Sequence, residues 1–298
     1  MRDEVSDRAY AAGWALVKRM PERMARATFN GLAEQVWRRR GTGVQQLERN
    51  LRRVVGPHTS HQDLRRLSHR AVESYFRYWR EAFRLPNLSP QQIVSTIEVD
   101  GQEHMRAAIA AGRGLLIVLP HSGNWDHAGA WATIDYMPLT TVAERLKPES
   151  LYERFLDYRR SLGMEVLALG DRMVLPTLRR RLNDGGMVCL LADRDLSASG
   201  IQVEFFGEPT KMPAGPALLA YETGADLMPA SLWYEPDRSR VRIHPPVLLD
   251  RAAPRAGVVR EATQVVADAF AKGIAEHPED WHMLQRLWLT DLPPRPAP

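Results

Sequence analysis

Cysteine is nearly absent from this chain. Cys189 is the only cysteine among 298 residues, so no disulfide can form within the chain. Such a composition is typical of a protein in a reducing compartment. Cys189 lies in the middle of an apolar run, and we therefore expect a buried and unreactive thiol.

Long hydrophobic runs are also absent. No stretch approaches the roughly 18 apolar residues that a membrane-spanning helix needs. The first residues lack the basic and then apolar pattern of a signal peptide. Apolar residues still make up 44% of the chain and charged residues 26%, which is enough to bury a core. We therefore expect a globular protein that would meet a membrane only at the membrane surface.

Sequence motifs of three large enzyme classes are missing. No Gly-x-Gly-x-x-Gly follows a predicted strand, and no phosphate-binding loop ending in Gly-Lys-Ser or Gly-Lys-Thr is present. This disfavours an enzyme that uses a dinucleotide or a nucleoside triphosphate. The Gly-x-Ser-x-Gly turn that carries the nucleophile of α/β-hydrolases is missing too, which disfavours an esterase of that type.

Basic residues, in contrast, are concentrated near the N-terminus. Residues 1–60 hold twelve Lys and Arg against six Asp and Glu, whereas the remainder holds 28 against 30. A basic segment can face nucleic acid or an anionic membrane surface. Tryptophan and aliphatic residues interleave with the arginines here, which favours a membrane-associating helical segment and no nucleic acid partner. An ordinary solvated helix face is an equally good interpretation of the pattern.

Helical periodicity dominates residues 1–90. Apolar residues at helical spacing predict one or two helices over 7–40, separated at Pro21, and another over 61–84. Further helices are expected directly after His121 and over 148–162, 173–184 and 257–276.

Short apolar runs alternate with these helices from about residue 95 onward. Strands are expected at six of them: 115–119, 140–143, 164–168, 187–191, 227–233 and 241–244. Such alternation predicts an α/β fold, with a central and mostly parallel sheet flanked by helices. We see no linker that would separate domains, so we predict one domain over 1–298 with a mostly helical part (1–90) and an α/β core (95–290).

The segment His121-Ser-Gly-Asn-Trp-Asp126 follows the first of these strands. Reactive residues of α/β folds gather just beyond the carboxyl ends of strands. Asn124 can cap the next helix, and Asp126 in its first turn could reach the imidazole and hold one tautomer. A histidine that acts as a base on an alcohol needs such help. The alternative is a histidine that only caps a turn, and we expect the neighbouring His127 to be structural.

Two more strands end in charged residues: Glu144, Arg145 and Lys147 follow one, and Asp193, Arg194 and Asp195 follow another. Charges at buried sheet ends are costly unless they are paired or face a ligand. Together with His121 these residues outline one rim of a cleft. Arg145, Lys147, Arg159 and Arg194 could bind phosphates or an acceptor. Ion pairing with Glu144, Asp193 and Asp195 explains the same charges equally well.

Five segments occur in an order that is typical of one enzyme family: Pro120–Asp126, Ala143–Lys147, Ala192–Asp195, Val203–Gly207 and Lys211–Gly215. In these segments the chain resembles the bacterial lipid acyltransferases related to the lipid A lauroyl and myristoyl transferases, whose signature is His-x-x-x-x-Asp. Segments 78–86, 144–152 and 281–285 most resemble the mycobacterial phosphatidylinositol mannoside acyltransferases, a branch of that family. The resemblance covers nearly the whole chain.

The resemblance implies a specific reaction. These enzymes transfer a fatty acyl group, typically palmitoyl, from acyl-CoA to the 6-hydroxyl of a mannose on phosphatidylinositol mannosides. The acceptor lies in the membrane, and the enzyme works as a peripheral protein on the cytoplasmic face of the plasma membrane. Acyl-CoA is a co-substrate, and the reaction needs neither a metal nor another cofactor.

The resemblance also assigns roles to residues. His121 corresponds to the general base and Asp126 to its orienting partner. Asp193 stands where the family has a glutamate as the third acidic member. Four residues match positions that line the acyl-CoA site: His121, Arg159, Ser199 and Glu222. Glu222, an anion near a phosphate, needs a cationic bridge or must face elsewhere.

Two other functions remain open on the residues alone. A metal-dependent hydrolase could use His121, Asp126 and His127, although no further cluster with ligand spacing is evident. A non-catalytic protein that binds a membrane surface would account for the basic, aromatic N-terminus.

Overall fold

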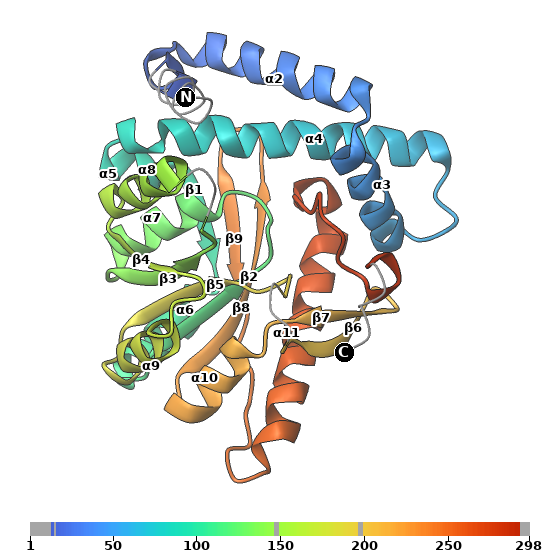
Figure 1. Cartoon of the computed structure of the whole chain (residues 1–298). Helices are drawn as coiled ribbons and strands as arrows, with labels where there is room; N and C mark the ends of the chain where they lie inside the picture. Colours follow the sequence, from blue (N-terminus) through green and yellow to red (C-terminus); the bar gives the residue numbers. More distant parts are fainter. Residues whose placement is uncertain (1–12, 15, 146–148, 196–198, 293–298) are drawn as a thin grey trace.

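A central sheet organises the computed structural model, which describes residues 13–14, 16–145, 149–195 and 199–292 (Figure 1). Within these residues the sheet has seven strands, in the spatial order β1 (Ile97–Asp100), β9 (Ser239–Ile243), β8 (Asp226–Tyr234), β2 (Leu115–Leu119), β5 (Met187–Leu191), β3 (Leu139–Ala143) and β4 (Met164–Ala168). Every neighbouring pair is parallel except β8 and β9. The predicted α/β class with a mostly parallel sheet is therefore confirmed, as are the six predicted strands.

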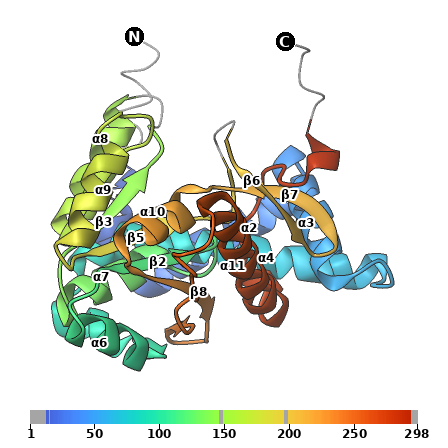
Figure 2. The same cartoon turned by 90° about the horizontal axis from the view of Figure 1, so that it is seen from below.

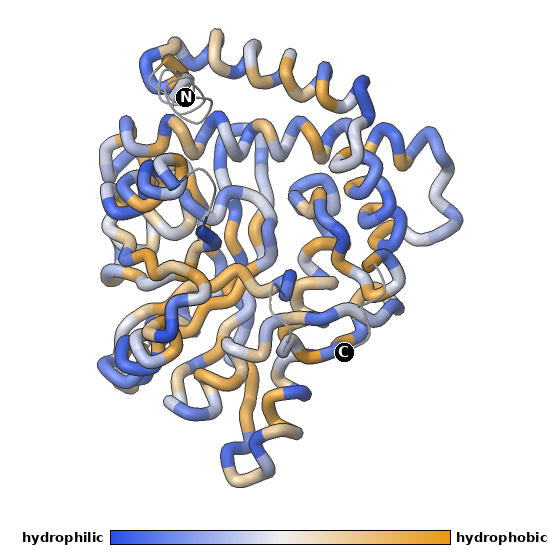
Figure 3. The backbone as a smooth tube through the Cα atoms, viewed as in Figure 1, coloured by the Kyte–Doolittle hydropathy of each residue, from blue (hydrophilic) through white to orange (hydrophobic). Residues whose placement is uncertain are grey.

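Strand β2 lies in the middle of this sheet and has helices on both faces. Leu116 and Val118 point into one core with helices α9 (Val174–Asn183), α10 (Gly215–Thr223) and α11 (Arg255–Glu276). Leu115, Ile117 and Leu119 point into the other core. Helices α5 (Pro90–Ser95), α6 (Gln102–Ala110), α7 (Trp125–Asp135) and α8 (Glu149–Ser161) cover that second face. Because both faces are covered, the strand is apolar throughout and does not alternate, and apolar segments run through the middle of the molecule (Figure 3).

Long helices of the N-terminal part come before the sheet in the chain: α2 (Glu22–Arg39), α3 (Thr42–Val55) and α4 (His61–Arg84). Helix α2 begins directly after Pro21, as expected, and lies along α4 (Figure 1). It contacts the protein through its buried residues Ala25, Phe29 and Ala33. Of the helix predicted over 7–40, residues 1–12 and Ala15 lie outside the described residues.

A separate hairpin of β6 (Ile201–Phe205) and β7 (Glu208–Met212) packs against α11 (Figure 2). These strands were not predicted, because neither is a continuous apolar run: β6 alternates between apolar and polar residues, and β7 is mostly polar. Phe206 and Gly207 form the turn between them, both with positive φ. The indole N–H of Trp288 donates to the carbonyl oxygen of Phe205, which ties the hairpin to the end of the chain.

The helices of the described residues are too short or too polar to cross a membrane. The predicted association of the N-terminal segment with a membrane surface stays a prediction.

Candidate active site

His121 and Asp193 meet at the carboxyl edge of the sheet. Leu119 of β2 and Leu191 of β5 are register partners in the parallel ladder, and each functional residue follows two positions later. The imidazole Nδ1 of His121 lies 2.6 Å from Oδ1 of Asp193, and the backbone N–H of His121 donates to Oδ2 at 3.0 Å. The His121 side chain is 28% exposed, whereas Asp193 is fully buried. The imidazole is thus held at one nitrogen and accessible from the other side.

Burial by itself would raise the pKa of the Asp193 carboxyl. The charge of His121 and the hydrogen bonds from His121 and Trp281 outweigh burial, and together they lower this pKa below its usual value. Asp193 is therefore an anion that can stabilise the imidazolium and fix the Nδ1–H tautomer. In this arrangement Nε2 of His121 is the nitrogen that could act as a base.

Asp126 does not orient His121, which corrects the role predicted for it. One oxygen of Asp126 accepts from Nε of Arg159 and the other from the hydroxyl of Tyr78, both at 2.8 Å. The carboxylate is buried and the Arg159 side chain is 16% exposed. Burial of the guanidinium opposes its charge, yet Asp126 keeps the pKa of Arg159 raised. The first turn of α7 points Asp126 toward α4 and α8, so Asp126 joins three helices behind the base.

The loop between β2 and α7 is fixed by local hydrogen bonds. Asn124 caps α7 as predicted, since its side chain accepts from the backbone N–H of His127. Gly123 has a φ of +54°, and a Cβ there would lie 3.1 Å from the backbone of Leu232, so only glycine fits without strain. The amides of residues 121, 122 and 123 donate to Asp193, Pro120 and Asp280, respectively. These three N–H groups are therefore already used in holding the loop.

A largely apolar cavity of about 450 Å³ opens beside His121. Its walls come from the ends of β3 and β5 and from helices α9 and α10, and they include Val142, Leu178, Leu190 and Leu219. Glu144, Arg194 and Asp195 supply polar groups to the same cavity. A base at the edge of an apolar cavity suits transfer of a group that carries a long hydrocarbon chain.

The model of the bacterial lipid A biosynthesis acyltransferase family matches residues 3–290. The chain belongs to this family. It is therefore an O-acyltransferase, and the interpretation as a non-catalytic binding protein is wrong. The relatives it resembles include the phosphatidylinositol mannoside acyltransferase of Mycolicibacterium smegmatis, 51% identical over 97% of this chain and 93% of the relative. The enzyme of the same name from Mycobacterium tuberculosis H37Rv is 49% identical over 96% of this chain and 90% of the relative.

The charged residues at the strand ends of this acyltransferase are partly paired. Arg194 lies 3.5 Å from Glu144 at the cavity. Arg145 is exposed and pairs with Glu149 on the first turn of α8. Lys147 lies outside the described residues. The ion-pairing interpretation thus fits Arg145, while Glu144 and Arg194 also face the cavity.

The remaining residues assigned to the acyl-CoA site lie apart from one another. Arg159 faces a second, small cavity of about 50 Å³ together with Asp126 and Cys189. Ser199 is exposed. Glu222 of α10 accepts from Nε of Arg179 on α9 at 2.9 Å. Arg179 is a cationic bridge of the kind that Glu222 requires if it lies near a phosphate.

Cys189 is only partly buried, because it forms part of the wall of the small cavity. Its surroundings nevertheless raise the pKa of the thiol to about 12 by desolvation. The thiol thus stays protonated at neutral pH, and a thiol of this kind is a poor nucleophile.

The residues of the hydrolase alternative do not converge. His127 is buried, with Nδ1 3.0 Å from the Ser239 hydroxyl and Nε2 2.9 Å from the carbonyl oxygen of Ile93. Burial lowers its pKa, and the histidine is structural as predicted. The part of the chain that the structure describes contains no group of three or more His, Cys, Asp or Glu arranged to hold a metal ion.

The segment 280–282 was missed by sequence reasoning, although it contacts the base directly. The indole N–H of Trp281 donates to Oδ2 of Asp193, and the backbone N–H of His282 donates to the carbonyl oxygen of His121. The segment lies about 160 residues after His121 and has no periodicity or motif that predicts this contact. Only the family resemblance over 281–285 singles out part of this segment.

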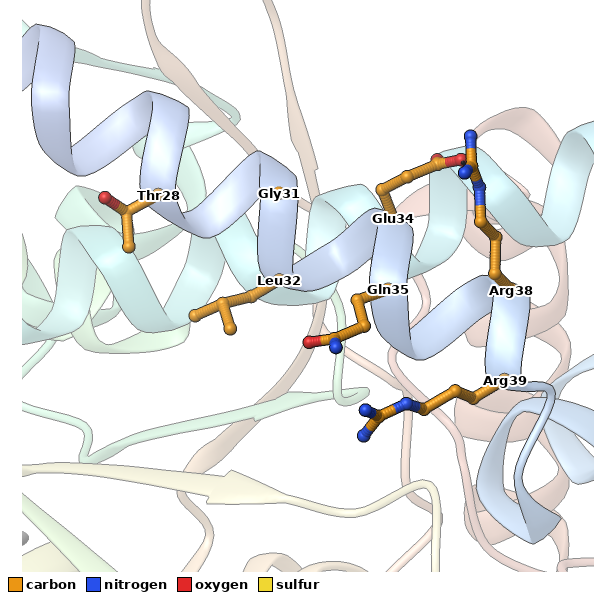
Figure 4. A pocket seen from close by; sticks show the side chains of 7 residues that line it. All are labelled: Thr28, Gly31, Leu32, Glu34, Gln35, Arg38 and Arg39. Carbon is orange, nitrogen blue, oxygen red and sulfur yellow. Dashed lines mark hydrogen bonds and ion pairs between the residues drawn. The ribbon is translucent and has the colours of Figure 1, made fainter.

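The outer face of α2 carries a shallow recess (Figure 4). Thr28, Leu32 and Gln35 line it, and Arg38 and Arg39 stand at its end (Figure 4). This face turns away from the buried residues that pack on α4, and it combines exposed apolar and basic side chains.

Proposed function

We propose that this acyltransferase moves a palmitoyl group from acyl-CoA to the 6-hydroxyl of a mannose on a phosphatidylinositol mannoside. The names of the relatives, at about half identity over nearly their full length, support the acceptor. The observation that carries the proposal is the close contact between His121 and the buried Asp193 at the mouth of an apolar cavity.

His121 acts as the general base in this reaction. Its Nε2 takes the proton of the mannose hydroxyl while that oxygen attacks the thioester carbonyl carbon, and the carbonyl oxygen becomes an oxyanion. Asp193 stabilises the imidazolium through Nδ1–H. The intermediate collapses to an ester, the carbon–sulfur bond breaks, and the imidazolium returns the proton to the CoA sulfur. No acyl-enzyme is needed, which agrees with the high pKa of Cys189.

The apolar cavity suits the acyl chain of the donor. Its aliphatic walls begin beside His121, so the thioester of a chain lying in it would be next to the base. Arg179 and Glu222 join α9 and α10 one turn beyond the cavity residue Leu219, and the guanidinium provides a positive charge for a CoA phosphate. We assign Arg159 and Ser199 to the donor site by resemblance. Glu144, Arg194, Arg145 and Lys147 are our candidates for contacts with the acceptor.

The acceptor is a lipid, and we propose that the enzyme reaches it as a peripheral protein on the cytoplasmic face of the plasma membrane. Helix α2 supports this orientation. Met24, Leu32 and Val36 on its outer face are 58%, 41% and 37% exposed, and Arg38 and Arg39 follow in its last turn. Apolar groups below the headgroups and cations among them would bind an anionic surface.

An assay of CoA release tests the function directly. Purified protein is mixed with acyl-CoAs of several lengths and a phosphatidylinositol mannoside, and free CoA is measured with a thiol reagent. We expect release with the mannosylated lipid, fastest with palmitoyl-CoA, and only background release with phosphatidylinositol. Mass spectrometry of the product should place the new ester on the mannose 6-oxygen.

The variant His121→Ala is the control for the base. Without the imidazole, CoA release should fall by about 1,000-fold or more while the protein still binds acyl-CoA. Equal release with mannosylated and mannose-free lipid would contradict the proposed acceptor. Unchanged release in the variant would contradict the assignment of His121.

A further inference from the structure

Trp281 contacts the acid of the His121–Asp193 pair directly. The indole Nε1 lies 3.0 Å from Oδ2 of Asp193, and both residues are fully buried. The indole is itself held among the rings of Phe205 and Trp288 at centroid distances of about 6 Å. A rigid aromatic donor thus binds one oxygen of the carboxylate (Oδ2), while the imidazole contacts the other (Oδ1).

The two oxygens of Asp193 have different donors. Oδ1 contacts the imidazole Nδ1 of His121, while Oδ2 accepts from the backbone N–H of His121 and from the indole of Trp281. A buried carboxylate that loses one of its donors bears a large desolvation penalty. The indole therefore both lowers the pKa of Asp193 and holds the plane of the carboxylate.

The backbone around Trp281 fixes the same loop. Ser122 and Trp281 form an antiparallel bridge, in which Gly123 donates to the carbonyl oxygen of Asp280 at 2.9 Å and His282 donates to that of His121 at 2.7 Å. The Asp280 carboxylate is in turn held by the Ser74 hydroxyl and by the backbone N–H of Tyr234. The position of the indole relative to His121 is thus set by hydrogen bonds on both sides.

We propose that Trp281 is a positioning residue for catalysis, which acts through Asp193 and does not touch the substrate. This rests on the proposed function of His121 as the general base. With the indole N–H in place, Oδ1 points at Nδ1 of His121, and the hydrogen bond from the indole to Oδ2 offsets part of the negative charge of the carboxylate. Without the indole N–H, the carboxylate can rotate. Its charge is then less well stabilised, so the pKa of Asp193 should rise, and the imidazolium of His121 should also hold its proton more tightly.

The variant Trp281→Phe tests this role. It removes the indole N–H and keeps an aromatic ring. We expect kcat for CoA release to fall about tenfold or more, with KM for acyl-CoA and acceptor unchanged. The acidic limb of the pH–rate profile should move upward by about one pH unit, because the base loses its proton only at higher pH.

Trp288→Phe is the matched control. Trp288 is also fully buried in the same aromatic cluster, and its indole N–H donates at 3.0 Å, but to a backbone carbonyl oxygen and not to Asp193. Both variants should lose thermal stability to a similar degree. Only Trp281→Phe should change the pH profile. If Trp281→Phe does not fold, β-(3-benzothienyl)alanine at position 281 keeps the shape of the indole and removes only the donor.

A double-mutant cycle separates positioning from general damage. In the Asp193→Asn background, Trp281→Phe should lower kcat less than twofold further, because the residue through which it acts has already been changed. An equal fold-loss in both backgrounds would overturn the proposal. So would a Trp281→Phe enzyme with the kcat and pH profile of the unsubstituted enzyme.

A titration without substrate keeps this test independent of the proposed reaction. The imidazole of His121 is followed by NMR in the unsubstituted protein and in Trp281→Phe. A higher imidazole pKa in Trp281→Phe than in the unsubstituted protein supports the role of the indole, even if the acceptor assignment fails. Identical titrations of the two proteins overturn that role. Absence of CoA release from the unsubstituted enzyme would contradict the proposed function instead.

Discussion

Asp193 is one methylene shorter than the glutamate that the resemblance places at this position, yet it reaches the imidazole at 2.6 Å. Its backbone follows β5 directly, level with His121 after β2, so a short side chain spans the gap. Glutamate here would insert an extra methylene into a fully buried site. An aspartate therefore suffices to hold Nδ1 of His121 in this protein.

Asp126 has a different task at the residue scale, and its variants should separate stability from chemistry. Asp126→Asn leaves the largely buried Arg159 guanidinium without its anionic partner, so we expect a loss of about 3 kcal/mol in the free energy of unfolding. Denaturant unfolding of Asp126→Asn, Arg159→Met and the double variant measures the coupling. The loss of unfolding free energy in the double variant should be clearly smaller than the sum of the losses in the two single variants.

The outcome for Asp193→Asn provides the contrast. This variant should lose most activity while the Asp126–Arg159 pair stays intact. If Asp126→Asn kept full stability and lost activity as completely as Asp193→Asn, the orienting role of Asp126 would have to be reinstated.

At the scale of elements, helix α2 has two dissimilar faces. Ala25, Phe29 and Ala33 are buried against the protein, whereas Met24 and Leu32 project from the other side. Exposed apolar residues in a row on one helix, followed by arginines, are typical of a membrane-surface helix.

Vesicle binding tests the outer face of α2. In Met24→Glu/Leu32→Glu, acidic groups replace apolar ones on the exposed face, so the fold should stay intact. We expect binding to phosphatidylglycerol–phosphatidylcholine vesicles to weaken at least about tenfold, measured by co-sedimentation. Val265→Glu on α11, also at an exposed apolar position, should bind as the unsubstituted protein does. Equal binding by all three proteins would remove α2 from the membrane contact.

At the scale of the whole molecule, the segment 280–282 connects parts of the fold that are distant in sequence. The Ser74 hydroxyl of α4 donates to Asp280 at 2.6 Å and lies 2.9 Å from Nε2 of His282. Burial lowers the pKa of His282 to about 3, helped by the charge of His121, and raises that of Asp280 to about 6. The helical part and the sheet thus share a buried polar network beside the base.

This network predicts how stability depends on pH. His282 is neutral in the fold, so its contribution to the free energy of unfolding is complete above pH 6.5 and is lost as the pH falls toward 3. Asp280 acts in the opposite sense: its contribution is complete below pH 3.8 and is lost as the pH rises through 6. A comparison of His282→Gln with the unsubstituted protein leaves Asp280 in both and isolates the histidine.

The free energy of unfolding should therefore fall more steeply for the unsubstituted protein than for His282→Gln between pH 6.5 and 4. Over this range the fall in the free energy of unfolding should be several kcal/mol larger for the unsubstituted protein, since each unit of pKa shift corresponds to about 1.4 kcal/mol. Urea unfolding at a series of pH values measures this. His58→Gln, at an exposed histidine, should follow the unsubstituted protein. Parallel curves for all three would show that His282 is not buried as a neutral group.

The sequence by itself predicted six of the nine strands that the structure describes, several of the long helices and the position of His121 beyond a strand end. These features depend on local periodicity, proline and capping residues, which act over a few positions. Strand β1 and the β6–β7 hairpin were not predicted, because the prediction relied mainly on continuous apolar runs. These strands mix apolar with polar residues, and β6 alternates strictly between them.

Only the tertiary structure decided which residues serve the base. Asp126, five residues from His121, was the natural candidate by proximity along the chain. The sheet order places β5 beside β2, and Asp193 thereby reaches His121 from 72 residues away, while Trp281 completes the contact from a later loop. Strand order and register depend on packing of the whole core, and local sequence patterns do not encode them.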